Sequence, residues 1–167
     1  MKVKNIIADC AQILGLGDVG EDSPDYSILF RCANLVAANA ASSYLECIET
    51  KSFHAPTGRI EFSEFNRQVL QIKEVKMNGA VVRHELFMGF IMVPSGTVDV
   101  TYSFIPVFED GEDEAGIVPM SGSAFVYGIL AEYAFISGMF NEAKVWNQKF
   151  EDIVYGEGKT GRARKIK

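Results

Sequence analysis

The 167-residue sequence contains little of what most catalytic sites are built from. It has two histidines, His54 in an expected turn and His84 in an expected strand, and neither has a cysteine, serine or carboxylate motif around it that would indicate a triad. No serine lies in a G-x-S-x-G motif, the nucleophile turn of many hydrolases. The residues therefore give no argument for an enzyme, and we expect no catalytic residue, metal or cofactor.

Cysteine is equally scarce. Cys10, Cys32 and Cys47 are an odd number, widely spaced and set among apolar helical neighbours. This spacing excludes a disulfide framework and matches no zinc motif. The sequence predicts three reduced core thiols in a cytosolic product.

Long hydrophobic runs are also missing. The N-terminus has two lysines but no continuous apolar region, so a signal peptide is not expected. The most apolar stretch, residues 124–140, is interrupted by a glutamate, a serine and a glycine and is too short for a membrane span. We expect a soluble protein without membrane contact.

Two glycine motifs are similar to nucleotide-binding loops but lack their context. In Gly156-Glu157-Gly158-Lys159-Thr160 the first glycine of a P-loop is replaced by Ile153, and the preceding residues have helical spacing. Gly15 to Gly20 matches G-x-G-x-x-G, yet it follows an amphipathic helix instead of a strand and precedes an acidic segment. A nucleotide-dependent enzyme is a third interpretation, and it rests on these motifs alone.

Charge is distributed unevenly along the chain. The net charge is −6, but residues 1–158 contain 11 basic and 22 acidic residues. The other five basic residues follow without an acid: Lys159, Arg162, Arg164, Lys165 and Lys167. The sequence thus predicts an acidic body with a basic C-terminal tail.

The first 52 residues favour two helices. Residues 2–15 have the spacing of a short amphipathic helix. Ser23 as N-cap and Pro24 at the first helical position predict a second helix running to about Glu49. Its expected buried face contains Leu29, Cys32, Leu35, Val36, Asn39, Ala40, Ser43, Tyr44 and Cys47.

Residues 53–108 favour β-structure. Val69–Met77 is an expected strand, Asn78-Gly79 is a strong hairpin signal, and Val81–Leu86 is expected to return along it. Residues 97–104 alternate strictly between polar and apolar, which is typical of a half-buried strand. Four or five antiparallel strands are expected, as a small domain inserted between helical segments.

Residues 109–155 are expected to return to helix after an acidic segment. Residues 124–131 are apolar nearly all round, which predicts a helix buried on several sides or in an oligomer interface. A last amphipathic helix begins near Asn141, and the glycines after Tyr155 are expected to end regular structure, leaving residues 156–167 as a flexible tail. The acidic segment contains Glu109, Asp110, Glu112, Asp113 and Glu114.

The spacing of these acids does not fit an EF-hand, so we expect a solvated loop and not a calcium site. The loop is also a possible acidic contact surface for the basic tail of a neighbouring copy. The tail could instead bind DNA weakly. A protein partner is favoured, because the arginines are few and have no aromatic neighbours. The predicted fold is α+β: a bundle of about four helices, an inserted antiparallel β-domain and a basic tail.

Two stretches carry a resemblance to a known family: YGILAEYAFISGMFNEAKVWNQKF from Tyr127 to Phe150, and VPSGTVDVTYSFIP. With the order of elements, they resemble the head-to-tail connector (adaptor) proteins of tailed bacteriophages. The resemblance implies a structural subunit of the virion neck, made in the host cytoplasm. It implies a homo-oligomeric ring, typically of twelve subunits, that binds beneath the portal protein, extends the DNA channel and provides the attachment surface for tail or further neck proteins.

The resemblance also implies roles for the charged groups. Double-stranded DNA would pass an acidic channel wall without sequence-specific binding, and Lys159, Arg162, Arg164, Lys165 and Lys167 would reach the portal or a neighbouring subunit. The alternative is a helical protein-interaction module, because residues 138–150 are similar to part of a tetratricopeptide helix pair. No second copy appears at the expected period of about 34 residues.

Overall fold

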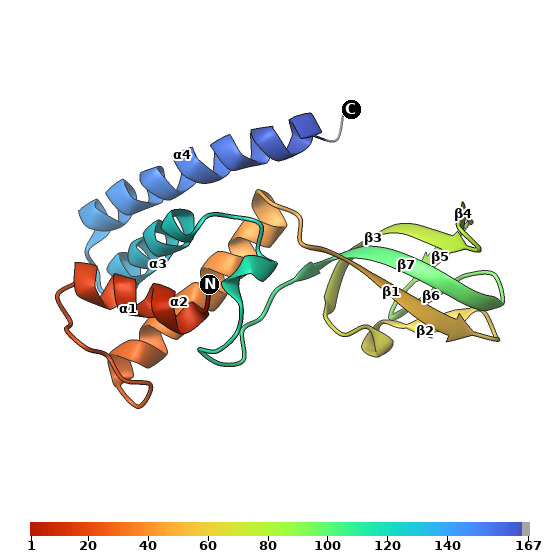
Figure 1. Ribbon diagram of the computed structural model, residues 1–167, viewed down its shortest axis with the longest axis horizontal. Coiled ribbons are helices and arrows are strands. Elements are labelled where there is room, and N and C mark those ends of the chain that lie inside the picture. The colour runs from red at the N-terminus through yellow and green to blue at the C-terminus, as the bar shows by residue number, and fades with distance from the viewer. Residues whose placement is uncertain (165–167) are drawn as a thin grey trace. The chain divides into compact units, whose positions relative to one another are not determined.

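The computed structural model describes the backbone of residues 1–164 and the side chains of residues 1–156. The chain divides into two compact units. The helical unit consists of Met1–Leu45 and of the chain from Pro106 onward, and the β unit consists of Glu46–Ile105. The protein is α+β, with its strands in antiparallel sheets, as Figure 1 shows.

The helical unit is organised around its third helix. The described helices are α1 (Val3–Ile13), α2 (Pro24–Ser43), α3 (Gly122–Ile136) and α4 (Phe140–Arg164), with a short 3-10 turn η2 (Ala115–Ile117). α3 contacts α1, α2 and α4, and Figure 1 shows α4 lying along it. The prediction of a helix buried on several sides is confirmed, because Phe125, Ile129 and Leu130 are all fully buried.

The start of α2 is confirmed and its end is corrected. Ser23 Oγ accepts a hydrogen bond from the Tyr26 amide at 3.0 Å, and Pro24 is the first helical residue. The helix ends at Ser43, not near Glu49, because the chain from Ile48 onward pairs as a strand. Leu29, Cys32, Val36 and Ala40 are buried as predicted, but Leu35, Asn39 and Ser43 are exposed. The buried positions continue instead through Ala33, Ala37 and Ala41.

A side chain of α2 fixes the chain where it re-enters the helical unit. Asn34 Oδ1 accepts a hydrogen bond from the Phe108 amide at 2.7 Å, and Asn34 Nδ2 donates to the Phe108 carbonyl at 3.2 Å. Phe108 is buried and its ring lies 5.9 Å from that of Phe125. The Asn34 side chain thus supplies hydrogen-bond partners for the amide and the carbonyl of Phe108, which belongs to no helix or strand.

The β unit holds two antiparallel sheets. One has the order β1-β7-β3-β4 and the other the order β2-β6-β5. The strands are β1 (Ile48–Ala55), β2 (Arg59–Glu61), β3 (Gln68–Met77), β4 (Ala80–Val81), β5 (Glu85–Phe87), β6 (Phe90–Met92) and β7 (Gly96–Ile105), with a 3-10 turn η1 (Phe62–Glu64) after β2. β1 pairs with β7 over its whole length, from Ile48 opposite Ser103 to Ala55 opposite Gly96.

Two sequence expectations for this region are corrected. Strand structure begins at Ile48 instead of residue 53, because the eight-residue ladder with β7 stabilises residues whose own sequence favours helix. The Asn78-Gly79 turn is confirmed, with φ of 51° and 79°. The returning strand is only Ala80–Val81, however, and Glu85–Phe87 pairs with β6 in the other sheet.

Aromatic rings fill the centre of the β unit. Phe65 lies 4.7 Å from Phe53 and 4.8 Å from Tyr102, measured between ring centroids. The alternation predicted for β7 is confirmed by the burial of Val98, Val100 and Tyr102. Burial and the hydrogen bond that Tyr102 donates to Glu49 both raise the pKa of the phenol, so it stays neutral.

The C-terminal helix is longer than predicted. α4 continues through Gly156 to Arg164, so the expectation that regular structure ends after Tyr155 is wrong. A helix tolerates an interior glycine at a cost of about 1 kcal/mol relative to alanine, so one glycine is a weak stop signal without other helix-ending features. On the described part, Ala143, Phe150 and Val154 are buried.

Candidate functional site

The acidic segment is tied to the N-terminal residues of the same unit. Lys2 and Lys4 both donate to the Glu112 carboxylate, and the Met1 amino group lies 2.7 Å from Glu114 Oε2. Backbone bonds reinforce these pairs: the Val3 amide donates to the Asp113 carbonyl at 3.0 Å, and the Lys4 amide donates to Gly111 at 2.9 Å. The two lysines lower the pKa of Glu112 to about 2, chiefly through their hydrogen bonds.

The remaining acids of the segment bond mainly to its own backbone. Asp113 Oδ2 accepts from the amides of Glu109 and Asp110, at 2.5 and 3.2 Å. Asp110 Oδ1 accepts from the Glu112 amide at 2.8 Å. These are the bonds of a folded turn. Glu109, Asp110, Glu112 and Glu114 are exposed all the same, as expected of a solvated loop. The role of the loop as a contact surface for a neighbouring copy stays a prediction.

A glycine and a tyrosine hold this segment against α2. A Cβ atom at position 111 would overlap the Tyr26 hydroxyl and would lie 3.0 Å from Lys4 Cβ. Tyr26 is buried, and its hydroxyl has no partner within the described part of the chain. The segment therefore closes over the start of α2, and its role in the described structure is to complete the helical unit.

The side chains of the predicted basic cluster lie outside the described residues. Lys159, Arg162 and Arg164 belong to the last turns of α4, and Lys165 and Lys167 follow the last residue with a described backbone. Their role as a partner-binding group stays a prediction.

Two other groups of sequence candidates have structural positions. His54 lies on β1, where its Nδ1 is 3.3 Å from Thr97 Oγ1, and His84 lies between β4 and β5. All three cysteines are free and buried. In residues 1–156 no three His, Cys, Asp or Glu side chains are grouped so as to hold a metal ion.

The two glycine motifs have the helical context that the spacing predicted. Gly15, with φ of 71°, lies just beyond α1, and Gly156 lies inside α4. Neither motif follows a strand, so neither forms the strand-turn-helix that a phosphate loop requires.

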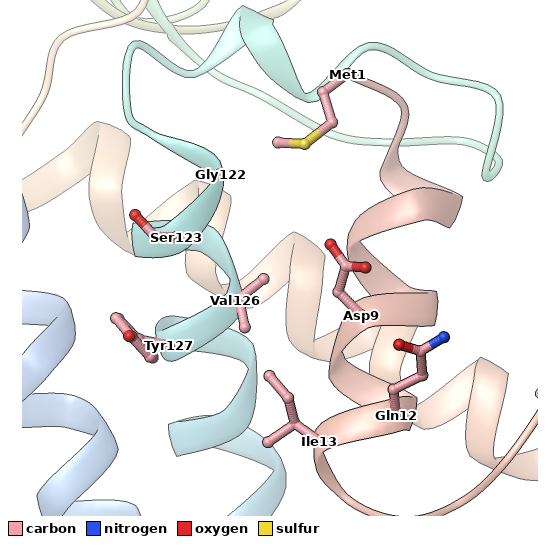
Figure 2. A pocket seen from close by; sticks show the side chains of 8 residues that line it. All are labelled: Met1, Asp9, Gln12, Ile13, Gly122, Ser123, Val126 and Tyr127. Carbon is pink, nitrogen blue, oxygen red and sulfur yellow. The ribbon is translucent and has the colours of Figure 1, made fainter.

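A groove lies between α1 and α3, with a volume of about 550 Å³. Figure 2 shows Asp9 and Ile13 on α1 across from Val126 on α3, whereas the Tyr127 ring turns toward α4, where it stacks on Trp146. Met1 closes one end, where its side chain occupies the space that a Cβ at Gly122 would need. Cys10 lies beneath the groove, with Sγ 3.9 Å from the Val126 carbonyl. The side chains that line the groove include one carboxylate, Asp9, and no basic group, so they offer little charge for recognition.

A second depression lies at the turn between α3 and α4, and we call it the α3–α4 hollow. Its volume is about 430 Å³, and its lining includes Ala131, Glu132, Phe135, Phe140, Ala143 and Lys144. Phe135 and Phe140 are 62% and 64% exposed, and their rings meet edge to face at 5.7 Å. Ile136 and Met139, in and beside the same turn, are also exposed.

The third feature is the end of β5 together with the turn that leads to β6, which we call the hairpin tip (Leu86, Phe87 and Met88). Leu86 is 59% exposed and Met88 is completely exposed. The Phe87 ring stacks on Phe90 at 4.9 Å, and the Arg59 guanidinium lies 3.7 Å from the centre of the Phe90 ring. The rings thus brace an apolar turn that projects into solvent.

Neither the hollow nor the hairpin tip was predicted from the sequence. Met88 is the most exposed large apolar side chain described. The available signal was the sequence of the turns. FISGMF at 135–140 and ELFMGF at 85–90 each place large apolar residues on both sides of a glycine turn, where a monomer has nothing to cover them.

No helix within residues 1–164 combines the length and apolar character needed to cross a membrane. Comparison with protein-family models and with curated proteins found no match for this chain.

Proposed function

We propose that this chain is a structural subunit of the neck of a tailed bacteriophage. It would form a homo-oligomeric ring beneath the portal protein, extend the DNA channel and provide the surface to which tail or further neck proteins attach. Such a role requires no catalytic group, metal or cofactor. The subunit would be made in the host cytoplasm and would end in the virion.

The observation that carries this proposal is the gathering of large apolar side chains at two exposed turns. Phe135, Ile136, Met139 and Phe140 surround one, and the hairpin tip forms the other. Isolated exposed apolar residues are normal, but contiguous groups on an acidic, water-exposed chain are typical of protein–protein contact sites. Two different sites on one subunit suit the head-to-tail contacts from which rings are built.

The two segments that resemble connector proteins contain main elements of the helical unit and of the β unit. Residues 127–150 contain most of α3, the turn and the first part of α4, and the second segment contains β7, which lies between β1 and β3. A bundle-like helical unit with an inserted β unit and a basic C-terminal extension is the architecture that the resemblance implies.

The charge distribution supports the proposed passage of DNA. Residues 1–158 hold 22 acidic against 11 basic residues, and an acidic wall repels phosphates, so that DNA slides without sticking. The five basic residues beyond them are proposed to contact the portal or a neighbouring subunit, where acidic groups would pair with them.

The test is assembly with a portal. The purified chain, mixed with the portal ring encoded beside its gene, should form a ring on that portal, seen by electron microscopy and weighed by native mass spectrometry. Portal mixed with an acidic protein of similar mass is the control. A chain that stays monomeric and shows no affinity for the portal would contradict the proposal, as would a gene without portal or capsid neighbours.

A second candidate, the tetratricopeptide-like interaction module, is favoured by the direct packing of α3 on α4. In that case the α3–α4 pair would bind an extended peptide, and the chain would have no affinity for the portal. A peptide-array screen with the same purified chain separates the two functions.

A further inference from the structure

The hairpin tip is an exposed turn, and the α3–α4 hollow is an open depression. The tip presents Met88 on a two-residue turn with Gly89, and Leu86 and Phe87 at the end of β5 just before that turn. The hollow is an open apolar depression walled by the rings of Phe135 and Phe140, with the buried Ala131 and Ala143 in its lining. The hollow has a volume of about 430 Å³, and a narrow turn can enter a depression that a flat surface cannot.

Their charges are complementary. Glu132 and Lys144 line the hollow, and neither forms an ion pair with another side chain in residues 1–156. Arg83 and Glu85 flank the tip, are exposed, and are likewise without an ion pair in that range. Each surface thus combines an apolar centre with one unpaired charge of each sign, so that docking can pair Arg83 with Glu132 and Glu85 with Lys144.

We propose that the hairpin tip of one copy inserts into the α3–α4 hollow of the next copy. The inference rests on the proposed function, because it names the contact that would join neighbouring subunits of the ring. The contact is heterologous: every copy uses its tip on one neighbour and its hollow on the other, and a closed ring leaves neither surface exposed.

The size of the contact indicates when it forms. Three side chains are far fewer than the about 20–30 residues that each partner contributes to a stable complex. One tip in one hollow is therefore too small to hold a dimer at low concentration. The contact should accumulate on a portal ring, which holds many copies side by side, or at high protein concentration.

Crosslinking between separately labelled copies tests the contact. One preparation carries Met88→Cys and a mass tag, and the other carries Asn147→Cys, beside Lys144 in the hollow. After mixing on the portal, a short bismaleimide should join the two preparations. The pair Met88→Cys with Ser42→Cys, an exposed site on α2, is the control and should remain uncrosslinked. Equal crosslinking of the control would overturn the proposal. So would the absence of a crosslink between the two preparations when a variant with both Met88→Cys and Asn147→Cys in one chain crosslinks within that chain.

Charge reversal gives a second readout that does not depend on a reagent. Glu132→Arg and Arg83→Glu alone should each weaken assembly on the portal by up to about fivefold. The double variant should recover it, because each tip then meets a hollow with the matching reversed charge. Single and double variants with equal assembly would contradict the inference.

The two proposals can fail separately. Rings that assemble on the portal without the Met88–Asn147 crosslink would remove this contact and leave the neck function standing. Crosslinked chains of copies, formed at high concentration by a protein without portal affinity, would support the contact and remove the neck function.

Discussion

Val36 of α2 packs directly against Gly128 of α3. A Cβ atom at position 128 would lie 2.7 Å from Val36 Cγ1 and 3.1 Å from Phe150 Cδ2, both closer than ordinary van der Waals contact. Three helices therefore meet at a point where only a glycine fits. The close approach is available because α2 presents small side chains there, including Ala33, Ala37 and Ala40.

We predict that Gly128→Ala destabilises the helical unit. Overpacking of a filled core costs about 1–3 kcal/mol, which exceeds the gain of about 0.5–1 kcal/mol from replacing a helical glycine. Gly156→Ala is the matched control, because a Cβ there meets nothing within 4 Å. Urea unfolding should show a lower midpoint for the first variant and an unchanged or higher midpoint for the second. The same shift in both would mean that α2 and α3 are not in close contact.

Asn34 should be required for the return of the chain to the helical unit. Asn34→Ala removes both bonds to Phe108 and leaves two backbone groups unsatisfied, at a cost of about 1–3 kcal/mol. Asn34→Asp keeps the acceptor for the Phe108 amide at 2.7 Å but places a carboxylate oxygen against the Phe108 carbonyl in place of the donor, so it should also lower the stability. Thermal unfolding of both variants measures the two losses of stability. An alanine variant as stable as the unmodified protein would show that Asn34 is not required.

The tie between the acidic segment and the N-terminal residues should respond to pH. The pKa of Glu112 falls from an ordinary 4.5 to about 2 in the folded state. A lowered pKa means that the stabilisation is fully present above pH 4.5 and is lost as the pH falls toward 2. Carboxyl NMR should show this titration, and the amides of Val3 and Lys4 should exchange faster in the same pH range.

The matched substitution is Glu112→Gln, with Glu109→Gln as control, because the Glu109 side chain forms no ion pair within residues 1–156. Only the first should speed amide exchange at Val3 and Lys4 at neutral pH. Equal exchange in both variants would show that the backbone bonds alone hold the segment.

The three thiols should be unreactive in the folded protein. Burial raises the pKa of Cys10 to about 12 and those of Cys32 and Cys47 to about 11, so very little thiolate exists at pH 8. Ellman's reagent should react slowly with the native chain and with three thiols after unfolding in urea. Rapid reaction of any one thiol before unfolding would contradict its burial.

Truncation after residue 156 separates folding from assembly. The buried residues of the described part of α4, Ala143, Phe150 and Val154, are all retained, so the helical unit should keep its unfolding temperature. Portal binding should be lost if the five basic residues carry it. Unchanged binding would remove them from the proposed interface. Substituting the five by glutamine in the full chain controls for the shortened helix.

Sequence patterns predicted the parts of the fold that are determined locally. The Ser23-Pro24 start of α2, the Asn78-Gly79 turn and the alternation along β7 each depend on a few neighbouring residues. The start of β1 could not be predicted in this way, because residues 48–52 become a strand only through pairing with β7, about fifty positions further along the chain.

The candidate site was predictable only in part. The acidic segment stands out in the sequence and was predicted as a solvated loop, but its partners Lys2 and Lys4 are more than a hundred positions away, so these ion pairs could not be predicted. The exposure of Phe135, Phe140 and Met88 was missed for a related reason. Periodicity assigns large apolar residues to a core, and only the fold reveals that a turn carries them beyond it.

The pairing of β1 with β7 has a consequence for how the chain folds. Ile48 lies opposite Ser103, and the Phe104 amide donates to the Cys47 carbonyl at 3.0 Å, so the β unit begins and ends at one point. Once these strands pair, the two ends of the β unit, about sixty residues apart in the sequence, lie close together. The unit then joins α2 to the segment leading to α3 as a short linker would. The free energy of strand pairing then offsets the entropy cost of closing that long loop, before the helices pack together. Insertions or deletions within the β unit that preserve this pair of strands should therefore leave the assembly of the helices almost unchanged.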